Sequence, residues 1–265
     1  MPARAARAGV IGYITVLVIL PLAALVFHGL ENGLGAVVRA VTEPVALDAL
    51  QLTFWTAAVM ALLNAVMGTA TAWVLVRYRF PGRALLSALV DLPFAIPTLV
   101  TGVMLVLLYG PQTPAGGWLS EHGFPVAYAP PGILLALLFI SVPFVVRAVE
   151  PVLMELDPAE EEAARTLGAG DWVIFRRIVL PALMPAILSG TLQSFARALG
   201  EFGSIVIVAG NIPHRTLTAP VHIFGEIESG SSQTAAAVSV VLVAVALLLE
   251  PLRRWLGRRL GARRA

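Results

Sequence analysis

Arg197 and Glu201 are charged residues four positions apart inside an otherwise apolar segment, where a charge is costly unless it pairs or lines water. On a helix this spacing puts both side chains on one face, so the two can neutralise each other as an ion pair. The planar donor fork of an arginine also suits oxyanions. Arg197 is therefore a candidate contact for an anionic group, with Glu201 tuning or gating it. The residues alone leave both interpretations open.

Ser194 and Asp91 are the other polar residues that we place along a candidate translocation path. Ser194 lies on the same segment as Arg197, where a small residue equally favours close helix packing. Asp91 comes just before Pro93 and Pro97, so it could instead hydrogen-bond a helix that these prolines bend. Both residues therefore have a structural and a functional interpretation.

The chain lacks the residues that most catalytic and cofactor sites require. It contains no cysteine and no lysine, which excludes disulfides, thiol nucleophiles, Schiff bases and the lysine of a P-loop. Residues 168–171 match the G-x-G-D of aspartyl intramembrane proteases, but that chemistry needs two aspartates within the bilayer and Asp171 lies in a polar stretch. We expect no catalytic residue, cofactor or metal in this chain, and any ATP and magnesium to be bound by another polypeptide.

The composition is that of an integral membrane protein. Hydrophobic residues make up 58% and charged residues 13% of it, whereas soluble domains carry about a quarter charged residues. The apolar residues fall in blocks of about 20, the length that crosses a bilayer. We predict an all-α polytopic membrane protein, with one transmembrane domain over residues 1–265. Its spans, about six, are expected at residues 9–27, 52–76, 84–109, 132–149, 182–210 and 234–252.

The arginines predict the orientation of these spans. Fifteen of the 18 basic residues fall on the side that holds the N-terminus, and only Arg39 and Arg215 fall on the other side. Because basic residues concentrate in cytoplasmic loops, we expect both termini and residues 150–181 in the cytoplasm. Arginines that flank apolar segments also argue against a nucleic-acid partner.

A patterned polar stretch at residues 150–181 separates the fourth and fifth predicted spans. It contains Glu162-Ala163-Ala164, then Gly168 after three residues, and Ile178-x-Leu180-Pro181 after nine more. Asp157-Pro158 favours a helix start, Gly168 favours a left-handed helix end, and Asp171 can cap a second helix. The residues predict two short helices joined by a glycine turn. They leave open whether this hairpin is merely solvated or docks on a partner.

This pattern closely resembles the cytoplasmic signature loop of type I ABC-importer permeases, without a departure at any motif position. The resemblance implies a permease fold whose coupling helix docks into a groove of a separate ATPase subunit. It also implies that the chain is a non-catalytic subunit. A lone channel would need no such loop. The coupling positions that the resemblance implies are Glu162, Ala163, Ala164, Gly168, Ile178, Leu180 and Pro181.

Three further segments, at residues 91–103, 128–153 and 194–216, look like the permeases of sulfate/thiosulfate importers, and most like their T-type subunit. That likeness implies an assembly with a second homologous permease, two ATPase subunits and a periplasmic sulfate/thiosulfate-binding protein. Molybdate- or tungstate-type permeases share the stretch at residues 195–203 and are the alternative. The long segment at residues 110–131 and the AGNIP segment at residues 209–213 favour the sulfate type.

Overall fold

The computed structural model describes the backbone of residues 2–261 and the side chains of residues 6–255, and every element in that part is a helix. The terminal arginines at positions 4, 258, 259, 263 and 264 lie outside the described side chains. In chain order the elements are α1 (Pro2–Ile14), the π-helical turn η1 (Thr15–Ile19), α2 (Leu20–Leu30), α3 (Leu34–Thr42), α4 (Pro44–Arg77), α5 (Arg83–Ala95), α6 (Thr98–Tyr109), α7 (Pro114–Glu121), α8 (Pro130–Glu155), α9 (Pro158–Thr166), α10 (Asp171–Ile174), the π-helical turn η2 (Phe175–Val179), α11 (Leu180–Leu199), α12 (Gly203–Val208), α13 (Ala219–Glu228) and α14 (Ser232–Gly261).

Five helices of the described chain are long and apolar enough to cross a membrane, and a bent pair would make six. The five cover Ala6–Leu30, Pro44–Arg77, Pro130–Glu155, Asp171–Leu199 and Ser232–Trp255. The bent pair is α5 with α6, which meet at 113° around Ile96 and Pro97. The apolar run predicted at 84–109 is therefore broken. Pro97 lacks a backbone N–H, and the residue before it is pushed into extended geometry, with Ile96 at φ −86°, ψ 126°.

The fourth of these long helices, which corresponds to the fifth predicted span, begins and ends earlier than the predicted range of 182–210. It runs from Asp171 through η2 to Leu199, and a separate helix, α12, follows after Glu201. Pro181 does not start the helix, because the wider π-helical turn η2 comes directly before it. Such turns let a helix accommodate a residue that cannot donate its backbone hydrogen bond.

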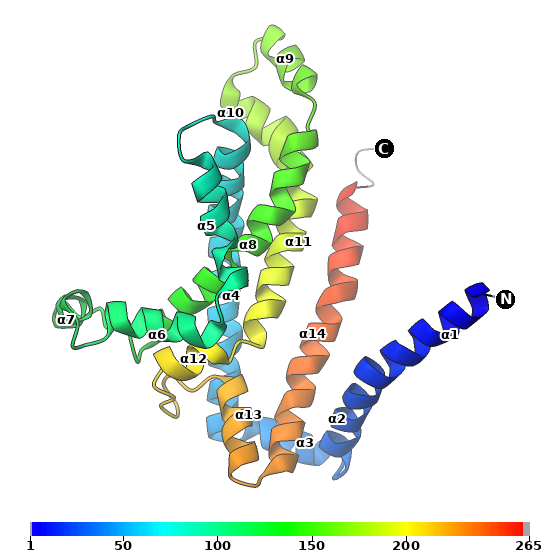
Figure 1. Cartoon of the computed structure of the whole chain (residues 1–265), viewed down its shortest axis with the longest axis vertical. Coiled ribbons are helices and arrows are strands. Elements are labelled where there is room, and N and C mark those ends of the chain that lie inside the picture. Colours follow the sequence, from blue (N-terminus) through cyan, green and yellow to red (C-terminus); the bar gives the residue numbers. More distant parts are fainter. Residues whose placement is uncertain (1, 262–265) are drawn as a thin grey trace.

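The centre of the fold is a layer in which α8 packs against both α4 and α11 (Figure 1). Small residues let the three helices approach closely. A Cβ at Gly68 of α4 would lie 2.8 Å from the Val145 Cβ of α8. A Cβ at Gly190 of α11 would lie 2.8 Å from the Cα of the same valine. Close backbone approach at small residues is the usual way in which helices associate in lipid.

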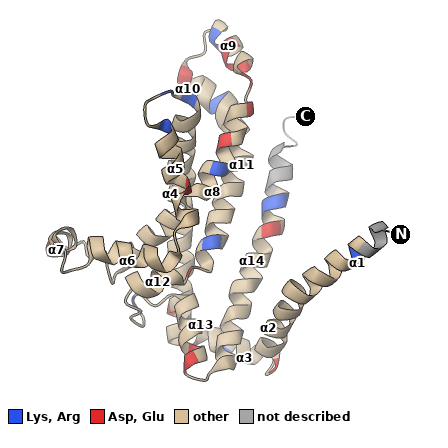
Figure 2. Ribbon diagram, viewed as in Figure 1, with Lys and Arg blue, Asp and Glu red and all other residues tan. Residues whose placement is uncertain are grey.

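The N-terminal helix leaves this layer at an angle, and its α2 part contacts α14 and α3 (Figure 1). Its apolar side chains, among them Val10, Ile11 and Tyr13, are exposed on all sides. Charged residues are concentrated at one end of the central layer, around α9, α10 and the neighbouring ends of α5 and α8 (Figure 2). The polar stretch predicted from the sequence is thus one end of the molecule.

Candidate coupling surface and intramembrane charges

The helix α9 forms the tip of that charged end. Asp157 caps it, because its carboxylate accepts a hydrogen bond from the Ala159 N–H at 2.9 Å, and Pro158 takes the first helical position. Gly168 ends the turn that follows, with φ +82°, a conformation that costs side-chain-bearing residues energy. The first short helix and the glycine turn that the sequence predicts are both present.

The second predicted short helix is not separate. Residues 171–181 form the first turns of the long helix that ends at Leu199. Asp171 does not cap it either: Gly170 occupies the N-cap position, and the Asp171 carboxylate lies 3.4 Å from the Arg165 guanidinium instead. The glycine turn therefore joins one short helix directly to a membrane-spanning one.

The predicted coupling residues divide into an outer and an inner group. Glu162, Ala163 and Gly168 are exposed, beside Leu167, which keeps 88% of its surface accessible. Ala164, Ile178 and Leu180 pack against the core between α4, α8 and α11, and Pro181 is exposed at its edge. The outer group offers a small-residue surface with a protruding leucine, which suits close docking of another protein. The inner group holds that surface in place.

An ion pair between Arg77 and Glu161 fixes α9 to the end of α4. Glu161 is 6% exposed, and the Arg77 guanidinium also lies over the Trp73 ring, 5.1 Å from its centroid. Arg165 adds a longer contact to the same carboxylate, at 3.9 Å. Sequence reasoning missed this link. The one feature of the sequence that could have indicated it is the run of glutamates at 160–162, of which Glu161 is buried.

Arg197 and Glu201 form the ion pair that their spacing permits, with 2.8 Å between Arg197 Nη1 and Glu201 Oε2. Glu201 is 1% exposed, and its other oxygen accepts hydrogen bonds from the Ser204 N–H at 2.9 Å and the Ser204 hydroxyl at 3.0 Å. The carboxylate is thereby fixed at the start of α12. The Arg197 side chain remains 35% exposed, and no other described residue bonds to its guanidinium. Arg197 therefore keeps free donors that could face a solute.

Ser194 lies beside this pair but points elsewhere. It is fully buried, and its hydroxyl donates to the Ser141 carbonyl of α8 at 3.2 Å. In this geometry Ser194 joins α11 to α8, and an exposed lining role would require the two helices to move apart.

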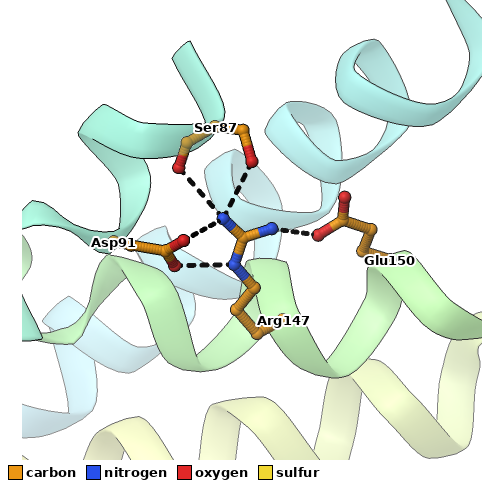
Figure 3. Close-up of polar contacts among 4 residues, drawn as sticks. All are labelled: Ser87, Asp91, Arg147 and Glu150. Atoms are coloured by element: carbon orange, nitrogen blue, oxygen red, sulfur yellow. Dashed lines mark hydrogen bonds and ion pairs between the residues drawn. The ribbon is translucent and has the colours of Figure 1, made fainter. Parts of the chain in front are cut away.

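The Asp91 carboxylate accepts a bidentate pair of hydrogen bonds from the Arg147 guanidinium of α8 (Figure 3), with 2.7 Å between Arg147 Nε and Asp91 Oδ1. The same guanidinium donates to the Ser87 carbonyl at 3.0 Å, to the Ser87 hydroxyl at 2.9 Å, and to Glu150. Arg147 is thus surrounded by acceptors, and the cluster ties α5 to α8. Sequence reasoning assigned Arg147 only a topological role, because nothing local pairs it with a residue 56 positions earlier.

These features define an inner membrane component of a binding-protein-dependent transport system, the description of the family that residues 64–262 match. In this family the ATPase is a separate subunit and the permease is non-catalytic. The chain belongs, within that class, to the CysT and CysW family of sulfate transport permeases. It is 45% identical to the probable sulfate transport system permease protein cysT of Nephroselmis olivacea, over 92% of this chain and 86% of that one.

Other members are similar over comparable lengths. The sulfate transport system permease protein CysT of Escherichia coli K12 is 43% identical over 89% of this chain and 86% of its own. The CysW protein of Synechocystis is 40% identical over 96% and 92%. Among solved structures, a bacterial ABC transporter involved in import of the acidic polysaccharide alginate matches with a TM-score of 0.78 at 19% identity. The match covers 97% of this chain and 95% of the other. At that identity the match shows the fold alone, which is the predicted importer-permease fold.

Proposed function

We propose that this chain is the T-type permease subunit of an ATP-driven importer for sulfate and thiosulfate. The observation that carries the proposal is the set of relatives named as sulfate permeases, which are 40–45% identical over about nine-tenths of the chain. The T-type assignment rests on the relatives named CysT, one of which has the highest of the identities above. A molybdate- or tungstate-type importer is the second candidate, and the shared stretch at residues 195–203 is its support.

The working complex would contain a second homologous permease, two ATPase subunits and a periplasmic sulfate/thiosulfate-binding protein. The binding protein would supply most of the selectivity, and the two permeases a gated path. ATP and magnesium would be held by the ATPase. The chain would lie in a bacterial inner membrane with both termini and α9 in the cytoplasm, which the arginine distribution supports. A reporter fused after Arg264 that is active only outside the cytoplasm would contradict this topology.

The outer group of the signature loop would be the docking surface for the ATPase. Support comes from α9, which projects from the end of the bundle and exposes Glu162, Ala163 and Gly168 next to Leu167. The path would include Arg197. A guanidinium that shares its charge with Glu201 can attract a doubly negative ion without trapping it, because tight binding would prevent release. Ser194 and Asp91 would contribute only if the helices that hold them separate during transport.

Uptake of labelled sulfate tests the proposal. Membrane vesicles from cells that lack this chain, with and without it restored, would be supplied with ATP and loaded binding protein, and thiosulfate or molybdate added as competitor. We expect uptake that depends on the restored chain and is blocked by thiosulfate but not by molybdate. Inhibition by molybdate alone would instead support the molybdate- or tungstate-type importer. Absence of labelled-sulfate uptake would reject sulfate as the substrate.

A further inference from the structure

An elongated apolar cavity of about 880 Å³ opens between α4 and the α10–α11 helix. It extends along α4 from Ala65 to Tyr78, and on the other side from Asp171 to Ile187. A helical segment as long as the first of these measures about 20 Å, and half the hydrocarbon thickness of a bilayer is about 15 Å. The cavity thus has the length of one leaflet and lies along two segments that cross it.

Aromatic side chains line the end of this cavity that lies nearest α9. Phe175 stands between Trp73 and Trp172, with ring centroids 5.6 Å from the first and 5.7 Å from the second. Tyr78 and Trp172 expose 56% and 70% of their surface. Tryptophan and tyrosine gather where the hydrocarbon meets the headgroups, so this end of the cavity is at headgroup depth.

A smaller basic cavity of about 310 Å³ adjoins the first and shares Trp172 with it. Arg176 and Arg177 line it, and no described residue forms an ion pair or hydrogen bond with either guanidinium. Asp171, at the rim of the apolar cavity, pairs with Arg165. Arg177 also borders a cavity on its other side that contains Glu155, Asp157 and Glu160. Arg176 is therefore the less compensated of the two charges.

We propose that these two cavities form one binding site for an anionic phospholipid of the cytoplasmic leaflet. An acyl chain would fill the apolar cavity between α4 and α11, and the phosphate would lie on Arg176 and Arg177. Basic pockets between membrane helices on the cytoplasmic side favour such headgroups, because a guanidinium donates two hydrogen bonds to a phosphate. The site is independent of the solute transported.

The depth of the cavity favours a lipid over a soluble partner. A cytoplasmic ATPase that docks on α9 cannot reach Ala65 or Ile187, which lie within the apolar lengths of their helices. A bound lipid at this place would join α4 to the same helix that continues from the glycine turn. The lipid would therefore contact both helices that hold α9 in place. Arg77, which pairs with α9, lies at the end of α4, and Asp171 lies at the start of the α10–α11 helix.

Lipid contact can be measured with brominated acyl chains, which quench a neighbouring tryptophan. The full complex would be reconstituted in phosphatidylcholine nanodiscs that contain about 10–20% of either brominated phosphatidylglycerol or brominated phosphatidylcholine. At this low fraction, a site that prefers anionic headgroups gives more quenching with the first lipid than with the second. We expect stronger quenching by the anionic lipid, and loss of most of that difference in the double variant W73F/W172F, which removes both tryptophans that line the cavity. The double variant R176Q/R177Q should reduce the preference for the anionic lipid at least about fivefold, as expected for loss of two basic contacts.

Two further variants distinguish lipid binding at this site from a general effect of surface charge. Arg79→Gln removes an exposed arginine outside both cavities and should leave the preference unchanged. Ala70→Phe should fill part of the apolar cavity without adding a fluorescent tryptophan, and should weaken quenching by both lipids.

Three results would overturn the proposal. The first is equal quenching by the two lipids in the wild-type complex. The second is an R176Q/R177Q complex that keeps its lipid preference, or one that loses its ATPase subunit instead, because the arginines would then be a protein contact. The third is a cross-link from position 70 to the second permease, because the apolar cavity would then be covered by protein.

Discussion

Arg77 at the end of α4 and Glu161 in the first turn of α9 form an ion pair across 84 residues of sequence. Their side chains are 24% and 9% exposed, so the pair is only partly screened by water. It is a direct mechanical link between a membrane-spanning helix and the helix that projects from the bundle. If α9 is the coupling helix, a force applied to it reaches α4 through this pair and α11 through the glycine turn.

Removal of the carboxylate should weaken that link. In Glu161→Gln the Arg77 charge remains partly buried without its partner. Breaking a fully buried pair costs about 3–5 kcal/mol, and the exposed part of Arg77 lowers the expected cost to about 2 kcal/mol. We expect the complex to assemble, with ATP-driven uptake reduced about tenfold at unchanged ATPase content, which is about 1.4 kcal/mol. Uptake in vesicles and subunit ratios on a gel measure the two quantities.

Glu160→Gln is the matched control, because Glu160 lies one residue earlier on α9, is exposed, and forms no ion pair with a described residue. It should transport like the wild type. The reversed pair, Arg77→Glu with Glu161→Arg, should recover part of the lost uptake. Equal uptake in Glu161→Gln and Glu160→Gln would show that the ion pair does not carry coupling.

Gly168 should tolerate a change of shape better than a change of charge. It has φ +82°, and no heavy atom lies within 4 Å of where a Cβ would stand, so a substitution meets backbone strain of about 1 kcal/mol but no clash. Asparagine and aspartate have the same shape and adopt this conformation more readily than other residues. We expect Gly168→Asp to abolish coupled uptake while the subunit stays in the membrane, and Gly168→Asn to retain part of it. Wild-type uptake by Gly168→Asp would contradict the docking surface.

Local signals in the sequence predicted the local features of the fold. The cap at Asp157 and the turn at Gly168 depend on neighbouring residues, and both appear as expected. The continuous helix through Pro181 was not predicted. A proline at the junction of a polar stretch and an apolar run resembles a helix boundary, whereas in the structure the helix continues through Pro181 after a π-helical turn.

The contacts between segments that are distant in the chain could not be predicted from the sequence. The link from Arg147 to Asp91 joins residues 56 positions apart, and beyond the 113° bend at Pro97 the helix α6 packs against α12, which lies far along the chain. The ion pair at Arg197 was accessible because its members are one helical turn apart. Sequence reasoning therefore found the pair at Arg197 and missed the pairs between helices, such as Arg77 with Glu161 and Arg147 with Asp91.

The Arg147 cluster should contribute mainly to stability. Its pair with Asp91 is partly exposed, with 29% and 49% of the two side chains accessible, so Asp91→Asn should cost about 1 kcal/mol, or a fall in melting temperature of about 3 °C. Arg147→Gln should cost more, because it leaves both Asp91 and Glu150 unpaired. Tryptophan fluorescence during heating of the nanodisc-embedded complex measures both changes.

The two substitutions should not add, since they remove the same interaction. The double variant D91N/R147Q should melt no lower than Arg147→Gln alone. Arg83→Gln, at the exposed start of α5, is the control and should leave the melting temperature unchanged. If Asp91→Asn keeps full thermal stability but transports poorly, Asp91 belongs to the path and the structural interpretation is wrong.

Arg197 differs from Arg147 because most of its donors are free, and this difference predicts a different result. Arg197→Lys keeps the charge and the distance to Glu201 but loses the planar donor fork, so we expect sulfate uptake to fall about tenfold, equivalent to about 1.4 kcal/mol of transition-state stabilisation, at unchanged melting temperature. Arg197→Gln should abolish uptake. Arg215→Gln, an exposed arginine outside the predicted spans, should behave like the wild type.

Glu201→Gln tests the gating part of the same interpretation. The amide keeps an acceptor for Ser204 but no longer neutralises Arg197, so the anion should bind more tightly and leave more slowly. We expect a lower KM for loaded binding protein together with a lower maximal rate. A purely structural ion pair would instead give normal kinetics per folded complex and a lower melting temperature in both Arg197→Gln and Glu201→Gln. The melting curve and the uptake curve, measured on the same preparation, distinguish the two.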